Sequence, residues 1–243
     1  MSKVMTAEQF IAKAKEAANS KTLYVMGCFG APMNEKNKKR YSTNNEFNRT
    51  YASKILAADG GVFGFDCVCL VKGLLWGWRG DRNAQYGGAV YASNGVPDIG
   101  EDAMIKKCSD VSTDFSKIVP GAFLWMKGHC GIYIGNGLAV EATPKWKWKV
   151  QITAVANIGP KAGYNSRTWT KWGKLPWIDY TEKKPEPIDL KKKVPVNVDG
   201  KIVECTGNIV DGITYIQLRD LARMGLADVS WDANERIPIV KRR

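Results

Sequence analysis

The chain has 243 residues, 44% of them hydrophobic and 25% charged, and a formal net charge of +12. Its length allows one large domain, or one medium domain followed by a small one. No apolar run reaches the roughly 18 residues that a membrane-spanning helix needs, so a membrane span is excluded. Residues 1–180 carry +10 of the net charge. Such a basic part suits a polyanion, whether nucleic acid, anionic membrane or teichoic acid, although simple solubility explains the charge equally well.

The N-terminal segment lacks the apolar stretch and cleavage site of a signal peptide. It places Phe10, Ile11, Ala14 and Ala17 at helical spacing, which predicts a short amphipathic helix. We therefore expect synthesis in the cytosol without a signal peptide.

Six cysteines, at positions 28, 67, 69, 108, 130 and 205, show no pair of CxxC motifs. Cys67, Cys69, His129 and Cys130 are residue types that can ligate a metal. However, neighbours on a strand point to opposite faces, so residues 129 and 130 should not ligate one ion. We expect reduced, mostly buried thiols, with no metal and no cofactor.

The first half of the chain is predicted to mix helices, short apolar segments and loops. Residues 22–27 form an apolar segment, and the polar, basic stretch 34–49 is interpreted as an exposed loop. A glycine-rich loop from residue 60 leads into an apolar run that predicts a buried helix beginning near Asp66. A short helix is predicted near Glu101–Lys107.

The second half is predicted to be mostly strands. They cover residues 120–126, 129–134, 138–143, 146–156 and 167–180, and the second and third form a hairpin around Gly135-Asn-Gly137. A proline- and charge-rich linker follows at 181–193. Residues 194–243 are predicted to form a hairpin, a helix (Gln217–Met224) and a second hairpin. The predicted class is α+β, with a first domain over 1–180 and a small α+β domain over 194–243.

Cys67 has the sequence context of a nucleophile. A helix N-terminus and a neighbouring cation both favour a thiolate, and Asp66 is a suitable N-cap for the helix that begins there. If Cys67 is catalytic, its base must be His129, the single histidine of the chain.

Glu141 is the candidate that orients the imidazole. An odd-length turn centred on Asn136 pairs residue 131 with residue 141, which places His129 and Glu141 on one sheet face as diagonal neighbours. A two-residue turn would place them on opposite faces. Taken singly, each residue also has a structural explanation: Cys67 as helix packing, His129 as a core residue and Glu141 as a strand-edge charge.

These segments resemble the NlpC-type cysteine peptidases. Phe65-Asp-Cys-Val-Cys-Leu-Val71 is similar to their D-C-S-G-L-V signature, and His129-Cys-Gly-Ile-Tyr-Ile-Gly-Asn-Gly137 to their H-V-G-I-Y-I-G-N-G. Pro120–Met126 resembles their P-G-D-L-x-F strand and Leu23–Gly27 their Y-V-x-G-G. The resemblance spans roughly residues 5–180.

The resemblance implies a papain-like α+β fold that hydrolyses stem peptides of bacterial peptidoglycan, typically after D-glutamate. It implies Cys67 as nucleophile, His129 as base and Glu141 as third polar residue, with Asp66 and Tyr24 contacting the substrate or the oxyanion region. Val68 and Cys69 depart from the usual Ser-Gly. The third position is often His in the family, and a charged Glu141 should raise the pKa of His129.

Residues 194–243 resemble the small domain at the N-terminus of copper amine oxidases, but they contain no histidine, so no copper is inferred. Attachment to the wall is one role for this domain, and a stabilising or dimerising appendage is the other. The tryptophans at positions 146, 148, 169, 172 and 177 favour sheet packing or a groove for glycan or peptide over nucleic-acid stacking.

The sequence thus predicts a peptidoglycan hydrolase of the phage endolysin kind, acting at the bacterial wall after release. Its expected partners are the stem peptide and anionic wall polymers, not nucleic acid. Two alternatives stay open. One is an N-acetylmuramoyl-L-alanine amidase with the same dyad, and the other is a non-catalytic wall-binding protein on a degenerate peptidase fold.

Overall fold

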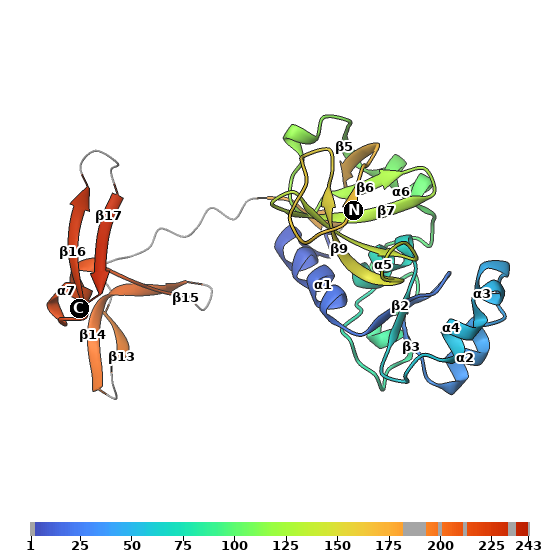
Figure 1. Cartoon of the computed structure of the whole chain (residues 1–243), viewed down its shortest axis with the longest axis horizontal. Coiled ribbons are helices and arrows are strands. Elements are labelled where there is room, and N and C mark those ends of the chain that lie inside the picture. The colour runs from blue at the N-terminus through green and yellow to red at the C-terminus, as the bar shows by residue number, and fades with distance from the viewer. Residues whose placement is uncertain (1–2, 182–192, 199–200, 211–212, 233–236, 243) are drawn as a thin grey trace. The chain divides into compact units, whose positions relative to one another are not determined.

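The computed structural model describes residues 3–181, 193–198, 201–210, 213–232 and 237–242 (Figure 1). It divides the chain into two compact units, residues 1–181 and residues 182–243. Both contain helices and sheets, so the predicted α+β class is confirmed. The predicted linker, residues 181–193, lies outside the described residues apart from its first and last positions.

A seven-stranded sheet forms the scaffold of the first unit, in the order β10-β9-β8-β7-β6-β11-β5. Its strands are β5 (Ser109–Ser112), β6 (Phe123–Met126), β7 (His129–Gly135), β8 (Leu138–Thr143), β9 (Lys149–Val155), β10 (Ser166–Arg167) and β11 (Lys171–Lys174). Along β7 and β8 the side chains alternate between two buried clusters. Ile132 and Val140 join the larger cluster, and Tyr133 and Ala139 join the smaller one on the other face.

Two predicted strands were wrong in extent. The strand expected over 146–156 begins only at Lys149, because Trp146 and Trp148 adopt φ angles of 65° and 53° that no strand tolerates. The segment 167–180 is divided among the end of β10, all of β11 and β12 (Ile178–Asp179). Strand β12 leaves the large sheet and pairs in parallel with β1 (Met5–Thr6). Pro176 separates β11 from β12, since proline has no N–H to donate to a ladder.

The β7–β8 hairpin reaches the predicted register by an unpredicted route. Its tip pairs Gly135 with Leu138, so Asn136 and Gly137 form a two-residue turn with φ angles of 53° and 73°. A register shift between Tyr133 and Gly135 then pairs Ile132 with Val140. This bulge compensates for the short turn, so residue 131 faces residue 141 as predicted.

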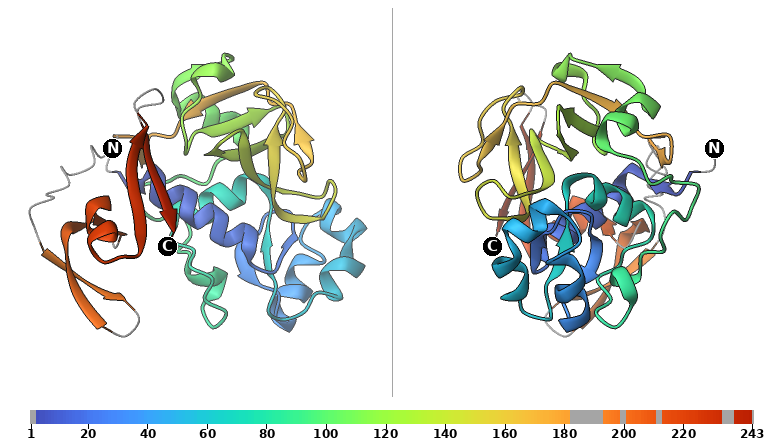
Figure 2. Two further views of the ribbon diagram at one scale, coloured as in Figure 1. Left: turned by 60° about the vertical axis from the view of Figure 1, so that its left-hand side comes forward. Right: turned by 90° about the vertical axis from the view of Figure 1, so that its right-hand side faces the viewer.

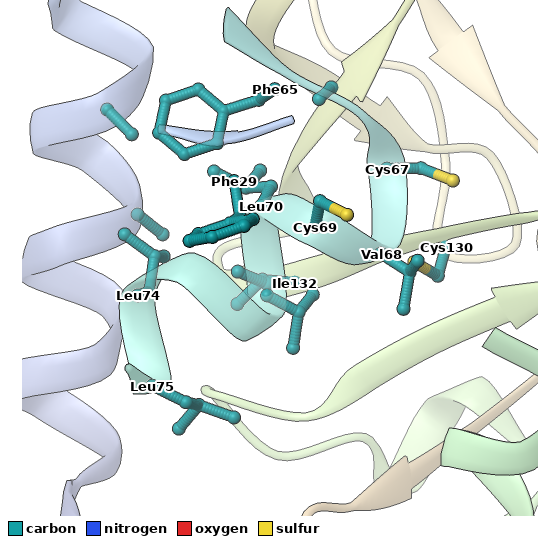
Figure 3. Close-up of a cluster of buried hydrophobic side chains, with 14 of the residues drawn as sticks. Phe29, Phe65, Cys67, Val68, Cys69, Leu70, Leu74, Leu75, Cys130 and Ile132 are labelled. Atoms are coloured by element: carbon teal, nitrogen blue, oxygen red, sulfur yellow. The ribbon is translucent and has the colours of Figure 1, made fainter. Parts of the chain in front are cut away.

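Helices α1 (Ala7–Asn19) and α5 (Cys67–Leu75) pack with the sheet in the larger buried cluster. Thr6 and Gln9 form a capping box at the start of α1. All nine residues of α5 are buried. Figure 3 shows Leu74 directed toward α1, whereas Val68, at the opposite end of α5, lies beside Cys130 of β7. The helix that begins after Asp66 is therefore confirmed and is central to the core.

A small sheet, with the order β2-β4-β3, leads into α5. Its strands are β2 (Thr22–Tyr24), β3 (Phe29–Pro32) and β4 (Phe63–Phe65). Because β4 ends at the residue before Asp66, the sheet fixes where α5 starts. The predicted short helix α6 is confirmed at Glu101–Lys107.

The exposed loop predicted over 34–49 is wrong. The segment forms α2 (Glu35–Tyr41) and α3 (Glu46–Thr50), followed by α4 (Ala52–Leu56). Asn34 and Asn45 cap the first two helices by accepting a backbone N–H three residues on, and Tyr41 is buried. Figure 2 shows α2, α3 and α4 gathered at the end of the unit remote from β5.

The described residues of the second unit form a three-stranded antiparallel sheet, one helix and a separate hairpin. The elements are β13 (Lys193–Val198), β14 (Lys201–Val210), β15 (Ile213–Ile216), α7 (Leu218–Arg223), β16 (Ala227–Asp232) and β17 (Ile237–Arg242). The predicted order of hairpin, helix and hairpin is confirmed, with β15 added. Across the described parts of both units, no helix has the length and apolar character needed to cross a bilayer.

Candidate active site

Cys67 is the first residue of α5, and the residue is 8% exposed. Asp66 is the N-cap: its Oδ1 accepts the N–H of Cys69 at 2.6 Å, and its Oδ2 accepts the N–H of Gly27 at 2.7 Å. The helix dipole and the free N–H groups of the first turn favour negative charge at this position. The thiol is thus held at the positive end of a buried helix.

His129 begins β7 and is fixed on two sides. Its Nε2 lies 2.6 Å from Oε2 of Glu141, so the predicted contact between these side chains is confirmed. Its ring stacks on Trp169, with centroids 5.5 Å apart and planes 10° from parallel. Because Nε2 is engaged by the carboxylate, Nδ1 is the nitrogen left to exchange a proton with Cys67.

The environment favours a thiolate paired with an imidazolium. Hydrogen bonding from Cys130, together with hydrogen bonding and charge from His129, lowers the pKa of Cys67 to about 4 although burial opposes this. Burial by itself would lower the pKa of His129, but its bonds with Cys67 and Glu141 outweigh burial and raise that pKa. Between the two pKa values both groups are charged, which is the state required of an activated thiol.

Glu141 is fully buried and carries three contacts. Its Oε2 also accepts the Nε–H of Arg167 at 2.7 Å, and its Oε1 accepts the hydroxyl of Thr153 at 2.7 Å. Burial raises the pKa of Glu141, but the hydrogen bonds from His129 and Arg167 more than offset it, so the pKa is lowered. The carboxylate is therefore ionised while it holds the imidazole.

Arg167, Thr153 and Cys130 were missed by sequence reasoning. Thr153 gave a weak signal as a polar residue in an apolar strand, and Arg167 gave none. Cys130 was set apart from His129 because strand neighbours point to opposite faces. The two residues do face opposite ways, yet both reach Cys67, because His129 sits at the very start of β7 and Cys130 faces α5.

The glycine after Cys130 makes room for the histidine platform. A Cβ at Gly131 would lie 2.9 Å from Cη2 of Trp169, closer than such atoms approach. Only glycine therefore lets the Trp169 indole lie against β7, where it stacks on His129. The glycine two residues after the histidine in the motif is therefore explained in this structure by the space that Trp169 needs.

Tyr24 and Asp66, the residues predicted to contact substrate, flank the thiol. Tyr24 is 6% exposed, and burial first, then the charge of Cys67, raise the pKa of its phenol. Burial and the charge of Cys67 raise the pKa of Asp66 to about 6 although it accepts two backbone N–H groups. The structure assigns Asp66 a role in building the site, and the predicted substrate contacts of both residues stay predictions.

Most of the tryptophans considered for a binding groove pack inside the unit. Trp169, Trp172 and Trp177 are buried, whereas Trp146 is 37% exposed. Among the described residues, no group of three or more His, Cys, Asp or Glu side chains could hold a metal ion.

Cys130 gives a prediction that is separate from catalysis. Removing its thiol in Cys130→Ala takes away the leading hydrogen bond that stabilises the Cys67 thiolate. We expect the pKa of Cys67 to rise by about one unit, measured as the pH dependence of its alkylation by iodoacetamide. Cys130→Ser is the matched control, since its hydroxyl still donates. An unchanged pKa in Cys130→Ala would show that His129 alone sets the thiolate.

A comparison with protein-family models finds no match, and a comparison with curated proteins finds no significant match. The resemblance to the NlpC-type peptidases therefore rests on the four sequence segments quoted above, chiefly those around Cys67 and His129.

Proposed function

We propose that the first unit is a papain-like thiol hydrolase that cleaves amide bonds in peptidoglycan stem peptides. The observation that carries this proposal is the row Cys67, His129 and Glu141, in which a thiol at a helix N-terminus meets an imidazole held by a buried carboxylate. A purely structural thiol needs no such partners, and burial would raise its pKa, as it does for Cys108.

The geometry supports an acyl-transfer mechanism. The Cys67 thiolate attacks the carbonyl carbon of the amide, and the N–H of Cys67 at the helix start stabilises the oxyanion that forms. The His129 imidazolium gives its proton to the leaving amine, which leaves a thioester on Cys67. His129 then takes a proton from water as the water attacks the thioester, and the sulfur leaves as thiolate, which releases the acid and restores the thiolate–imidazolium pair.

A cavity of about 610 Å³ is lined by residues on either side of Cys67 in the sequence, although not by Cys67 or His129 themselves, and its size suits a short peptide. Its lining includes Asp66, Val68 and Cys69 beside Cys67, and the rings of Phe29, Tyr86 and Tyr91. It also holds two cations, Lys72 and Arg40. Lys72 forms an ion pair with Asp98, whereas Arg40 bonds only to the Tyr86 hydroxyl and has no carboxylate partner in the described part of the chain. An unneutralised guanidinium favours a substrate with a free carboxylate, such as a stem peptide.

The basic charge of residues 1–180 supports action on the anionic wall, and we propose wall attachment as the role of the second unit. Cleavage after D-glutamate is the proposed specificity, as the motif resemblance implies. The amidase is the second candidate, because the same thiol and imidazole can attack the lactyl amide.

Incubation of purified protein with sacculi, followed by mass spectrometry of the released fragments, tests this proposal. We expect the full chain to release stem-peptide fragments and Cys67→Ala to release none, a loss of at least about 10³-fold. Cys108→Ala is the matched control, because burial raises the pKa of this thiol, it lies outside the lining of the cavity, and its loss should leave cleavage intact.

Each fragment pattern decides one alternative. New ends within the stem support the endopeptidase, and free lactyl groups indicate the amidase. Equal release by Cys67→Ala would reject the thiol mechanism. Sedimentation with walls and no release by the wild-type chain would favour the binding protein.

A further inference from the structure

The carboxylate that holds His129 is itself held by a second cation. Arg167 donates Nε–H to the same Oε2 atom that contacts His129, at 2.7 Å, and both partners are nearly or fully buried, with 11% and 0% of their side-chain surfaces exposed. The other oxygen, Oε1, accepts the hydroxyl of Thr153, so both oxygens of the Glu141 carboxylate have hydrogen-bond partners. A buried carboxylate without such partners would be neutral or displaced.

The guanidinium is fixed as firmly as the carboxylate. Its Nη2 donates to the Thr143 hydroxyl at 3.2 Å, and its Nη1 lies 3.9 Å from Sδ of Met126. Its central carbon lies 5.0 Å from the ring centre of Trp146 and 5.7 Å from that of Trp169, the indole on which His129 stacks. Arg167 thus belongs to the same packed unit as the imidazole.

The sheet brings Arg167 here from a distant part of the chain. Strand β10 is two residues long and pairs in parallel with β9 at the sheet edge, with Arg167 beside Val155. This short pairing delivers one side chain over the β8–β9 face that carries Glu141 and Thr153.

We propose that Arg167 is a positioning residue, which holds Glu141 as an anion in the one orientation that turns His129 toward Cys67. This inference rests on the proposed thiol chemistry. The charged groups that face Glu141 are His129 from β7 and Arg167 from β10, with Cys67 of α5 beyond the imidazole, and the β9 contact is the uncharged Thr153. Without Arg167, the imidazolium is the single cation beside a desolvated carboxylate.

The pH dependence of Cys67 alkylation by iodoacetamide tests the inference on the full chain, read by mass spectrometry of the Cys67 peptide. In Arg167→Gln, Glu141 should take up a proton at higher pH, and the imidazolium and thiolate should be lost with it. The acid limb of alkylation is the pH range in which the rate falls because Cys67 becomes protonated, and in the wild type it is centred near pH 4. We expect this limb to move upward by about one pH unit, so the rate at pH 4 falls about fivefold. Arg167→Lys, which keeps the charge, should restore at least half of the shift.

The double variant shows whether Arg167 acts through Glu141. Glu141→Gln alone should raise the acid limb, and adding Arg167→Gln should raise it no further. An acid limb that stays at its wild-type position in Arg167→Gln, or a further shift in the double variant, would overturn the proposal. If Arg167→Gln does not fold, Arg167→Lys takes its place as the test variant. In that case, an acid limb of Cys67 alkylation that is displaced as far in Arg167→Lys as in Glu141→Gln would overturn the proposal. Alkylation needs no peptide, so failure to cleave sacculi would leave this result standing.

Discussion

Replacing His129 by alanine is expected to reduce stem-peptide cleavage by about 10³-fold or more, because the chain loses its only imidazole and with it the proton donor for the leaving amine. The same change removes the cation beside Cys67, so the acid limb of Cys67 alkylation should move from about pH 4 toward the ordinary thiol range. Fragment release and alkylation, measured on the same samples, check both effects.

Lys127→Ala is the control for this prediction, since Lys127 is an exposed neighbour in the turn before β7. It should retain cleavage and the wild-type acid limb. A His129→Ala protein that still releases stem fragments at the wild-type rate would mean that another group handles the proton.

Asp66→Ala should be the most destabilising of the changes considered. It removes the N-cap of a wholly buried helix and the bond that ties α5 to Gly27. Caps and buried hydrogen bonds of this kind each contribute about 1 kcal/mol or more, so we expect the free energy of unfolding to fall by about 2–3 kcal/mol. Urea denaturation at neutral pH measures the change.

Asp66→Asn separates structure from substrate contact. Its amide oxygen still accepts from Cys69 N–H, but its NH₂ group cannot accept from Gly27, so about half of the loss should return. If Asp66→Ala unfolds at the wild-type urea concentration but has a raised KM for stem peptides, Asp66 would act by contacting the substrate and not by stabilising α5.

Local patterns predicted the parts of the site that lie close together in sequence. The apolar run after Asp66 indicated a buried helix with its cap, and the two apolar stretches around Asn136 indicated the hairpin. The register between His129 and Glu141 was also predicted, but from an odd-length turn. The structure reaches it with a two-residue turn and a bulge, two local features whose effects on side-chain direction cancel.

Tertiary placement could not be predicted in the same way. Arg167 lies 26 residues beyond Glu141 and reaches it through a two-residue parallel strand, for which no sequence periodicity exists. The helices over 34–49 were missed because the polar and basic composition of the segment indicated a loop. Its two Asn N-caps and the buried Tyr41 were not given enough weight as signals of helices. Capping residues carried more information there than hydrophobic content did.

The row of charges through the site has a consequence for the response to ionic strength. In the active state it runs thiolate, imidazolium, carboxylate and guanidinium, so the four charges sum to zero and each lies beside its opposite. Such a neutral, buried row projects little field beyond the roughly 8 Å over which physiological salt screens charge. The chemical step is therefore expected to be insulated from salt, whereas the proposed attraction of the +12 chain to an anionic wall is not. On the proposed function, salt concentration should thus alter where the protein acts without changing how its thiol reacts.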